Sequence, residues 1–270
     1  MVELARYPLG SARQQLAQKG RFFALSSDSF EPTPPLSSPN DELEHALNEL
    51  GNYATQRRPK DKAKPTIFMS AATELSEDKE ELLERIANDL TACQAEVLTS
   101  RQILFGKEHE KNGYDLASYV QKVVLEMPKY QYVIPVGTAE YLKEYNKRDE
   151  KPKTPIERLE KKILKAVSKI GEQASKKADD EEEDDGGEGA RILSMLLDGN
   201  PQAALPPFAI HRKLLHNFVC SDYSIEILKI GRAIHGIKPQ DGVLRNIIKK
   251  GYFDRLLDSA TPTHRPTLGR

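Results

Sequence analysis

The chain has 270 residues, and its 40 Lys and Arg nearly balance its 41 Asp and Glu, which gives a formal net charge of -1. This balance excludes a global basic field that would attract the whole chain to nucleic acid, so we expect no direct nucleic-acid binding. Cys93 and Cys220 are the only two cysteines, which excludes a disulfide scaffold and a cysteine-rich zinc site. Two reduced thiols, and no run of about 18 apolar residues, lead us to expect a cytoplasmic protein without a membrane segment.

The first 64 residues have the composition of an N-terminal extension. Ser26 to Asn40 is rich in Ser and Pro and predicts a linker. Between Asp41 and Tyr53, apolar residues recur at helical spacing and predict one short amphipathic helix. We interpret the basic run from Arg57 to Lys64 as a second linker.

From Pro65 the chain changes to short apolar runs that alternate with amphipathic segments. Each short run is typical of a buried strand, and each amphipathic segment of a helix that covers a sheet. The predicted strands are 66–70, 96–100, 130–136, 191–197 and 214–220. The predicted helices are one after Ser76, then 116–127, one that begins at Thr154, 227–237 and 244–256. We expect the polar segment 103–115 to be a long loop.

The helix after Thr154 has the clearest start signal in the chain. Thr154 can cap, Pro155 suits the first helical position, and Glu157 can complete a capping box. The nearly unbroken acidic run from Asp179 to Glu188 predicts a mobile loop. The domain prediction is therefore an extension over 1–64, an α/β domain over 65–257 with a charged insertion around 165–189, and a flexible tail over 258–270.

Strands that alternate with helices indicate an α/β fold with a parallel sheet covered by helices on both faces. We predict a flavodoxin-like five-stranded sheet with the order 2-1-3-4-5. Ligands of such sheets bind beyond the carboxyl ends of the strands. This rule directs attention to residues 70–73, 100–106 and 137–141 and to the loop after Leu197.

Several well-known chemical motifs are missing. The sequence has no Gly-x-Gly-x-x-Gly after the first strand, no Walker A loop and no Gly-x-Ser-x-Gly, which disfavours a dinucleotide grip of the Rossmann type, a P-loop NTPase and an α/β hydrolase. The six histidines form no metal-ligand pattern, so we expect no metal and no bound cofactor. We interpret His211 and His216, five residues apart, as structural.

A family resemblance becomes visible when these segments are read in order. Ile67 to Ala71 is similar to the first strand of TIR (Toll/interleukin receptor) domains, and Ile103 to Gly106 falls where that family has a Gly-containing loop. Tyr132 to Tyr141, which contains Thr138-Ala139-Glu140-Tyr141, resembles the third strand and the Ser/Thr-x-x-Tyr signature that follows it. Segments 191–207 and 218–223 resemble the fourth strand and the closing part. The resemblance covers residues 65 to about 256, although this chain lacks the Trp of the family's glutamate motif.

The resemblance implies an activity and a site. Enzymatic TIR domains cleave the bond between nicotinamide and ribose in NAD+. In this reaction NAD+ is a substrate and not a cofactor. The essential residue of these enzymes is a Glu on the third helix. A carboxylate suits this chemistry because the departing nicotinamide leaves an oxocarbenium-like ribose. Glu160 is our catalytic candidate because it borders the buried stripe of its helix. Glu157 is the alternative, and a solvated Glu160 without a catalytic role remains open.

The remaining candidate residues contact the substrate or pack in the core. The resemblance places Ser70 and Ala71 at the ribose, Phe105 and Gly106 at nicotinamide, and Thr138 and Tyr141 beside them. Such sites are often completed by a neighbouring subunit, so the expected partners are NAD+ and a second copy or another TIR-like domain. The alternative function is a non-catalytic adaptor that acts through TIR–TIR contacts in signalling or defence.

Overall fold

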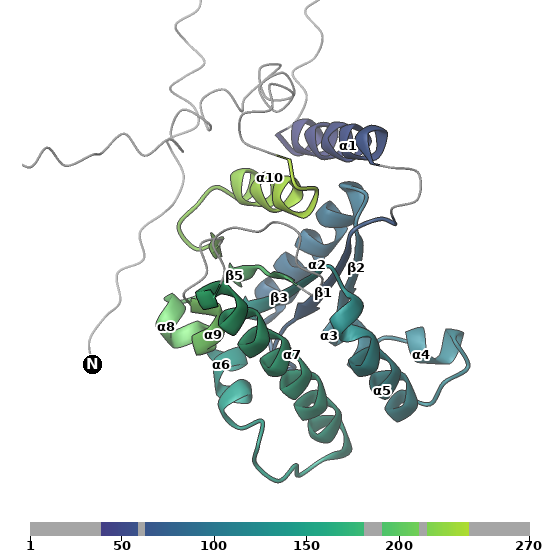
Figure 1. Ribbon diagram of the computed structural model, residues 1–270, viewed down its shortest axis with the longest axis vertical. Helices are drawn as coiled ribbons and strands as arrows, with labels where there is room; N and C mark the ends of the chain where they lie inside the picture. The colour runs from purple at the N-terminus through teal and green to yellow at the C-terminus, as the bar shows by residue number, and fades with distance from the viewer. Residues whose placement is uncertain (1–38, 59–62, 181–190, 211–214, 238–270) are drawn as a thin grey trace, which may run out of the picture. The chain divides into compact units, whose positions relative to one another are not determined.

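The structure is a computed structural model that describes residues 39–58, 63–180, 191–210 and 215–237 (Figure 1). Parallel strands form one sheet in the order β2-β1-β3-β5-β6, with β4 also paired to β3. The strands are β1 (Thr66–Ser70), β2 (Glu96–Thr99), β3 (Tyr132–Gly137), β4 (Arg191–Ile192), β5 (Ser194–Leu196) and β6 (Leu215–Asn217). The predicted flavodoxin-like α/β fold is confirmed, and the fourth predicted strand is interrupted at Leu193.

Strand β3 is the centre of the sheet, and all six of its residues are buried. A continuous apolar run suits a parallel strand that is covered on both faces, because the side chains on both sides of the strand are shielded from water. In register, Phe68 of β1 lies opposite Leu98 of β2 and Val133 of β3. These pairs fix which side chains point to each face.

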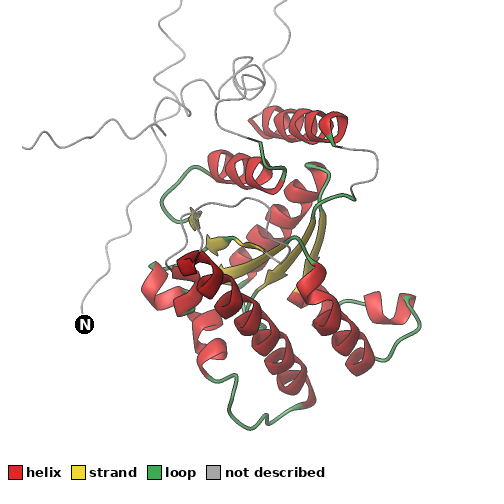
Figure 2. Ribbon diagram, in the orientation of Figure 1, coloured by secondary structure: helices red, strands yellow, loops and turns green. Residues whose placement is uncertain are grey.

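Helices cover both faces of the sheet (Figure 2). On one face, α2 (Glu77–Ala92) and α10 (Tyr223–Ile234) form a core with Ile67, Met69 and Ile134 of the strands. On the other face, α3 (Ser100–Phe105), α5 (Leu116–Glu126) and α7 (Pro155–Asp180) pack on Phe68 and Val133. The remaining described helices are α1 (Pro39–Arg57), α4 (Glu108–Lys111), η1 (Met127–Lys129), α6 (Ala139–Asn146), α8 (Pro201–Ala204) and α9 (Pro207–Ile210).

The helix of the N-terminal extension forms, and it joins the core of the α/β domain. Leu43, Leu47 and Leu50 of α1 are buried in the same cluster as α2 and α10, against which α1 packs. Gly51 permits this close approach, because a Cβ at that position would lie 3.0 Å from the backbone carbonyl carbon of Cys93. The α/β unit therefore begins structurally with α1, earlier than Pro65.

The predicted loop over 103–115 is wrong in its first half. Thr99 caps α3 by accepting a hydrogen bond from the Gln102 N–H at 3.0 Å, and the Gln102 side chain accepts one from the Thr99 N–H at 2.9 Å. This reciprocal capping box starts a helix directly at the end of β2. Ile103 and Leu104 are buried by it, and α4 follows before α5.

Helix α7 confirms the predicted start at Pro155 and extends into the segment expected to be an insertion. Its buried residues Leu159, Ile163 and Val167 recur at helical spacing and face the sheet. The helix reaches Asp180, so the first part of the segment 165–189 is regular helix. The acidic residues 181–190, the predicted helix 244–256 and the predicted tail 258–270 lie outside the described residues.

No helix in the described part of the chain is long and apolar enough to cross a membrane.

Candidate active site

A buried cluster of polar side chains lies at the carboxyl ends of β1 and β3. It contains three of the predicted substrate-binding residues. The Tyr141 hydroxyl donates a hydrogen bond to the Ser70 hydroxyl at 3.1 Å. Thr138 caps α6 by accepting the Tyr141 N–H at 3.1 Å. All three side chains have no exposed surface. The structure thus brings Ser70, Thr138 and Tyr141 together, but as a support beneath the site instead of as residues that touch a substrate.

Ala71 is also a structural residue. Its backbone N–H donates to the Ser100 hydroxyl at 2.9 Å, and the same hydroxyl donates to the Ala71 carbonyl at 3.1 Å. These two hydrogen bonds join the turn after β1 to Ser100, the first residue of α3. It fixes the two strand ends on which the site is built.

Phe105 and Gly106 lie at the end of α3, with contrasting exposure. The Phe105 side chain is 54% exposed, the second highest among the large apolar side chains that the structure exposes. Gly106 closes the helix where a Cβ would collide with the Gln102 carbonyl oxygen. Phe105 therefore offers an aromatic face to a ligand, whereas Gly106 allows the backbone to turn.

Arg101 connects Phe105 to the turn after β1. Its guanidinium lies 5.4 Å from the Phe105 ring centroid. It also donates a hydrogen bond to the Thr73 carbonyl and forms an ion pair with Glu80. These contacts occupy the guanidinium and hold the turn in place. We assign Arg101 a positioning role at this edge of the sheet.

A carboxylate that the sequence analysis did not select lies at the centre of this edge. Glu144, on α6, accepts hydrogen bonds from the Thr73 N–H at 3.0 Å, from the Thr73 hydroxyl at 2.7 Å and from the Glu74 N–H at 3.3 Å. Two backbone N–H groups of the turn after β1 thus converge on one carboxylate. Glu144 ties β1 to α6, and its carboxylate is fixed in position.

Glu160 lies beside Glu144. Burial raises the pKa of the Glu160 carboxyl to about 8, and a hydrogen bond to Glu144 and the charges of Glu144 and Glu157 act in the same direction. The physical cause is that a half-buried second negative charge next to Glu144 is unfavourable. Glu160 therefore holds its proton to a higher pH than an ordinary glutamate does.

Glu157 has a structural task. Its carboxylate accepts a hydrogen bond from the Lys153 N–H and lies 2.9 Å from the Lys161 ammonium, and its own N–H donates to Thr154. The hydrogen bond from Lys161 is the main cause that lowers the pKa of Glu157. The predicted capping contact with Thr154 is present, and the side chain reaches back one residue further, to Lys153. Of the two catalytic candidates, Glu160 has the environment of a functional acid.

A second network of charged side chains lies beside these residues, at the same edge of the sheet. The Lys79 ammonium lies 2.7 Å from Asp198, which follows β5, and 3.2 Å from Glu140 of α6. The hydrogen bond that Lys79 donates to Asp198 is the largest cause that raises the pKa of Lys79. This network joins the ends of β3 and β5 through α2. The loop after Leu197, selected from the sequence, thus lies at the same edge.

The paired carboxyl groups define the chemistry that this edge can perform. A carboxyl group whose pKa is raised, next to a second carboxyl group that is held by hydrogen bonds, can exchange a proton near neutral pH. Within the described residues no group of three His, Cys, Asp or Glu could hold a metal ion. The sequence signal that could have found Glu144 is its position, one turn after Glu140 and three residues after Tyr141, on the helix that leaves the third strand.

Comparison with protein-family models found no match to this chain, and neither the curated proteins nor the solved structures showed a significant match.

Proposed function

We propose that the chain is an NAD+ glycohydrolase that cleaves the bond between nicotinamide and ribose and is activated by self-association. The observation that supports this most is the carboxyl pair of Glu160 and Glu144 at the carboxyl ends of β1 and β3. Ligands of parallel α/β sheets bind at this end. The resemblance of the sequence to TIR domains implies a substrate site at the same edge of the sheet and Glu160 as its catalytic residue.

The pair suits hydrolysis of a glycosidic bond. When nicotinamide departs, the ribose becomes an oxocarbenium-like cation, which the negative charge of the pair stabilises. Water then adds to the cation and releases a proton, which the pair can accept. The products are nicotinamide, ADP-ribose and one proton, so charge and atoms balance.

Phe105 gives the edge an aromatic contact for the substrate. Its exposed ring can stack on a flat heterocycle such as nicotinamide, and Gly106 lets the backbone approach closely. Because Ser70, Thr138 and Tyr141 are buried, the remaining substrate contacts come from exposed groups, including those of a neighbouring copy. This is the reason that the proposal includes self-association. We also propose a cytoplasmic location, since both Cys93 and Cys220 are free thiols.

A second candidate function is a non-catalytic adaptor that acts through contacts between TIR-like domains. The observation in its favour is that large apolar side chains are exposed on neighbouring helices, Phe105 on α3 and Leu125 on α5, with Leu125 67% exposed. Exposed apolar groups of this size favour protein contacts.

One experiment separates the two functions. Purified full-length protein is incubated with NAD+ over a series of protein concentrations, while nicotinamide release and the oligomeric state are measured together. The enzyme proposal predicts release that rises more steeply than the protein concentration, in parallel with self-association. Self-association without release at any concentration would instead support the adaptor.

A further inference from the structure

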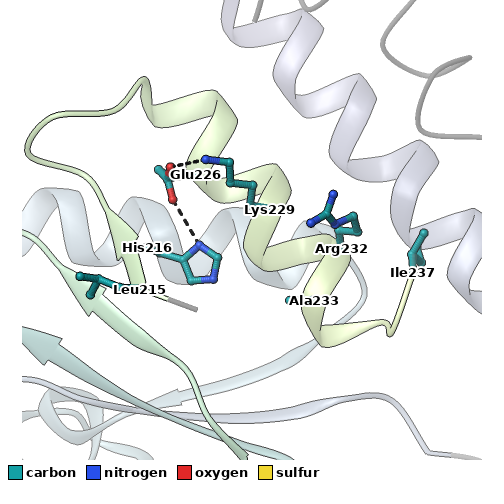
Figure 3. Close-up of a pocket in the computed structure, with 7 residues that line it drawn as sticks. All are labelled: Leu215, His216, Glu226, Lys229, Arg232, Ala233 and Ile237. Carbon is teal, nitrogen blue, oxygen red and sulfur yellow. Dashed lines mark hydrogen bonds and ion pairs between the residues drawn. The ribbon is translucent and has the colours of Figure 1, made fainter. Parts of the chain in front are cut away.

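A pocket lies at the opposite end of the sheet from the carboxyl pair. It has a volume of about 360 Å³ and is lined by Leu215, His216, Glu226, Lys229, Arg232, Ala233 and Ile237 (Figure 3). Leu215 is the first residue of β6, and the Ala233 carbonyl accepts a hydrogen bond from the hydroxyl of Tyr132, the first residue of β3. These contacts place the pocket toward the amino ends of the strands, between β6 and α10.

A buried polar chain forms one wall of this pocket. The His216 Nδ1 lies 3.2 Å from one oxygen of Glu226, and the Lys229 ammonium lies 2.8 Å from the other oxygen. Burial alone would raise the pKa of Glu226, but the hydrogen bonds from His216 and Lys229 lower it overall. Glu226 is therefore ionised, and Lys229 balances its charge. Figure 3 shows the Glu226 carboxylate between Lys229 and the His216 ring, which it orients.

The other ring nitrogen of His216 has no hydrogen-bond partner within the described part of the chain. The side chain is 5% exposed, and its Nε2 is buried without a hydrogen-bond partner. Leaving a buried polar atom without a hydrogen bond destabilises the fold, so native proteins rarely retain one without a reason. Because His216 also lines the pocket, a bound polar group is a natural partner for this nitrogen.

Arg232 adds a positive charge that none of the described residues balances. It is half-buried in the pocket lining, and burial lowers the pKa of its guanidinium. Among the described residues, no ion pair or hydrogen bond to the Arg232 guanidinium is found, although the neighbouring Lys229 is paired with Glu226. Together with the balanced Glu226 and Lys229, this leaves a net positive charge at the pocket.

We propose that this pocket binds a small organic phosphate, with the phosphate group between Arg232, Lys229 and His216. A guanidinium presents its N–H groups as a planar fork that matches phosphate oxygens, and the unpaired Nε2 of His216 supplies a further hydrogen-bonding atom. Leu215, Ala233 and Ile237 supply an apolar surface for the organic part. The volume falls within the range of roughly 300–1,000 Å³ that is typical of small-molecule sites.

Calorimetric titration of the full chain tests the site with three probes: inorganic phosphate, phenyl phosphate and neutral benzyl alcohol. The proposal predicts saturable binding of both phosphates, tighter for phenyl phosphate, and none for benzyl alcohol. Arg232→Gln removes a charged hydrogen bond, so it should weaken phenyl phosphate binding roughly ten-fold or more. His216→Gln should weaken it as well.

The matched control is Lys162→Gln, which removes an exposed charge on α7, remote from the pocket. It should leave the dissociation constant unchanged. A thermal melt of each variant shows whether the fold is intact, and Arg232→Gln leaves the His216–Glu226 pair in place. The proposal is overturned if phenyl phosphate does not saturate at millimolar concentration, or if it binds folded Arg232→Gln and the Lys162→Gln control equally well.

Discussion

Single residues at the carboxyl edge of the sheet divide their tasks according to burial. Ser70, Thr138 and Tyr141 are closed to solvent and bond to one another, whereas Glu160 keeps part of its carboxyl group accessible. A buried hydroxyl group contributes to the fold by forming a hydrogen bond with a neighbouring buried polar group. A half-buried carboxyl group beside a second carboxyl group is a candidate for acid–base chemistry, because its pKa is raised toward neutral pH.

The raised pKa of Glu160 predicts a stability change with pH. The ordinary pKa of Glu is 4.5, and the folded value is about 8, so the folded chain holds this proton more tightly than the unfolded chain. The resulting stabilisation is fully present below 4.5 and is lost as pH rises through about 8. Glu160→Gln cannot ionise, so its stability should exceed that of the unsubstituted protein increasingly across this window.

Urea unfolding at several pH values measures this difference. The control is Glu157→Gln, for which the sign is opposite: the folded pKa of Glu157 is lowered, so its contribution is present at neutral pH and is lost as pH falls. Parallel curves for Glu160→Gln and the unsubstituted protein would show that Glu160 is not perturbed.

The buried hydrogen bond between Tyr141 and Ser70 makes a second prediction. Tyr141→Phe leaves the Ser70 hydroxyl without its buried donor, so we expect the free energy of unfolding to fall by roughly 1–3 kcal/mol. The matched control is Tyr53→Phe, because the Tyr53 hydroxyl is buried without a partner in the described part of the chain. Chemical denaturation should show a loss for Tyr141→Phe and none for Tyr53→Phe, and equal losses would refute the assigned role of the bond.

At the scale of elements, helix α1 changes the limits of the α/β unit. The sequence predicted its helical face correctly, since Leu43, Leu47 and Leu50 are all buried. It did not predict the partner of that face, because a period of 3.6 residues identifies an apolar stripe but not what covers it. The partner is the surface that α2 and α10 form together.

This packing predicts that α1 contributes to the stability of the α/β unit. Leu47 has no exposed surface, so Leu47→Ala should lower the free energy of unfolding by about 2–5 kcal/mol. Asn48→Ala, an exposed change on the same helix, is the control and should have little effect. If Leu47→Ala melts at the same temperature as Asn48→Ala, α1 is an appendage that does not stabilise the domain.

At the scale of the whole molecule, the parallel sheet was predictable and the site was predictable only in part. Short apolar runs marked the strands because a doubly covered sheet needs them, and Pro155 marked the start of α7. Helix α3 was missed because its capping box lies at the end of a strand, where Thr99 serves both elements. Glu144 was missed because its importance depends on Thr73, 71 residues away in the chain.

The His216 pocket illustrates the same limit at the other end of the sheet. His216 and Glu226 are ten residues apart and belong to different elements, and their contact depends on how α10 lies over β6. Nothing in the local spacing of the histidines indicates that one nitrogen is satisfied and the other is not. The carboxyl pair and this pocket give the molecule two chemically distinct ends.

The most direct test of the central claim is nicotinamide release from NAD+ by Glu160→Gln and Glu157→Gln at a concentration where the unsubstituted protein self-associates. Glu160→Gln keeps the size and hydrogen-bonding ability of the side chain but can neither release nor take up a proton, so we predict a fall in rate of roughly 100-fold or more. Glu157→Gln should retain most of the activity. Equal rates for Glu160→Gln and the unsubstituted protein, or no release by any of the three, would contradict the account.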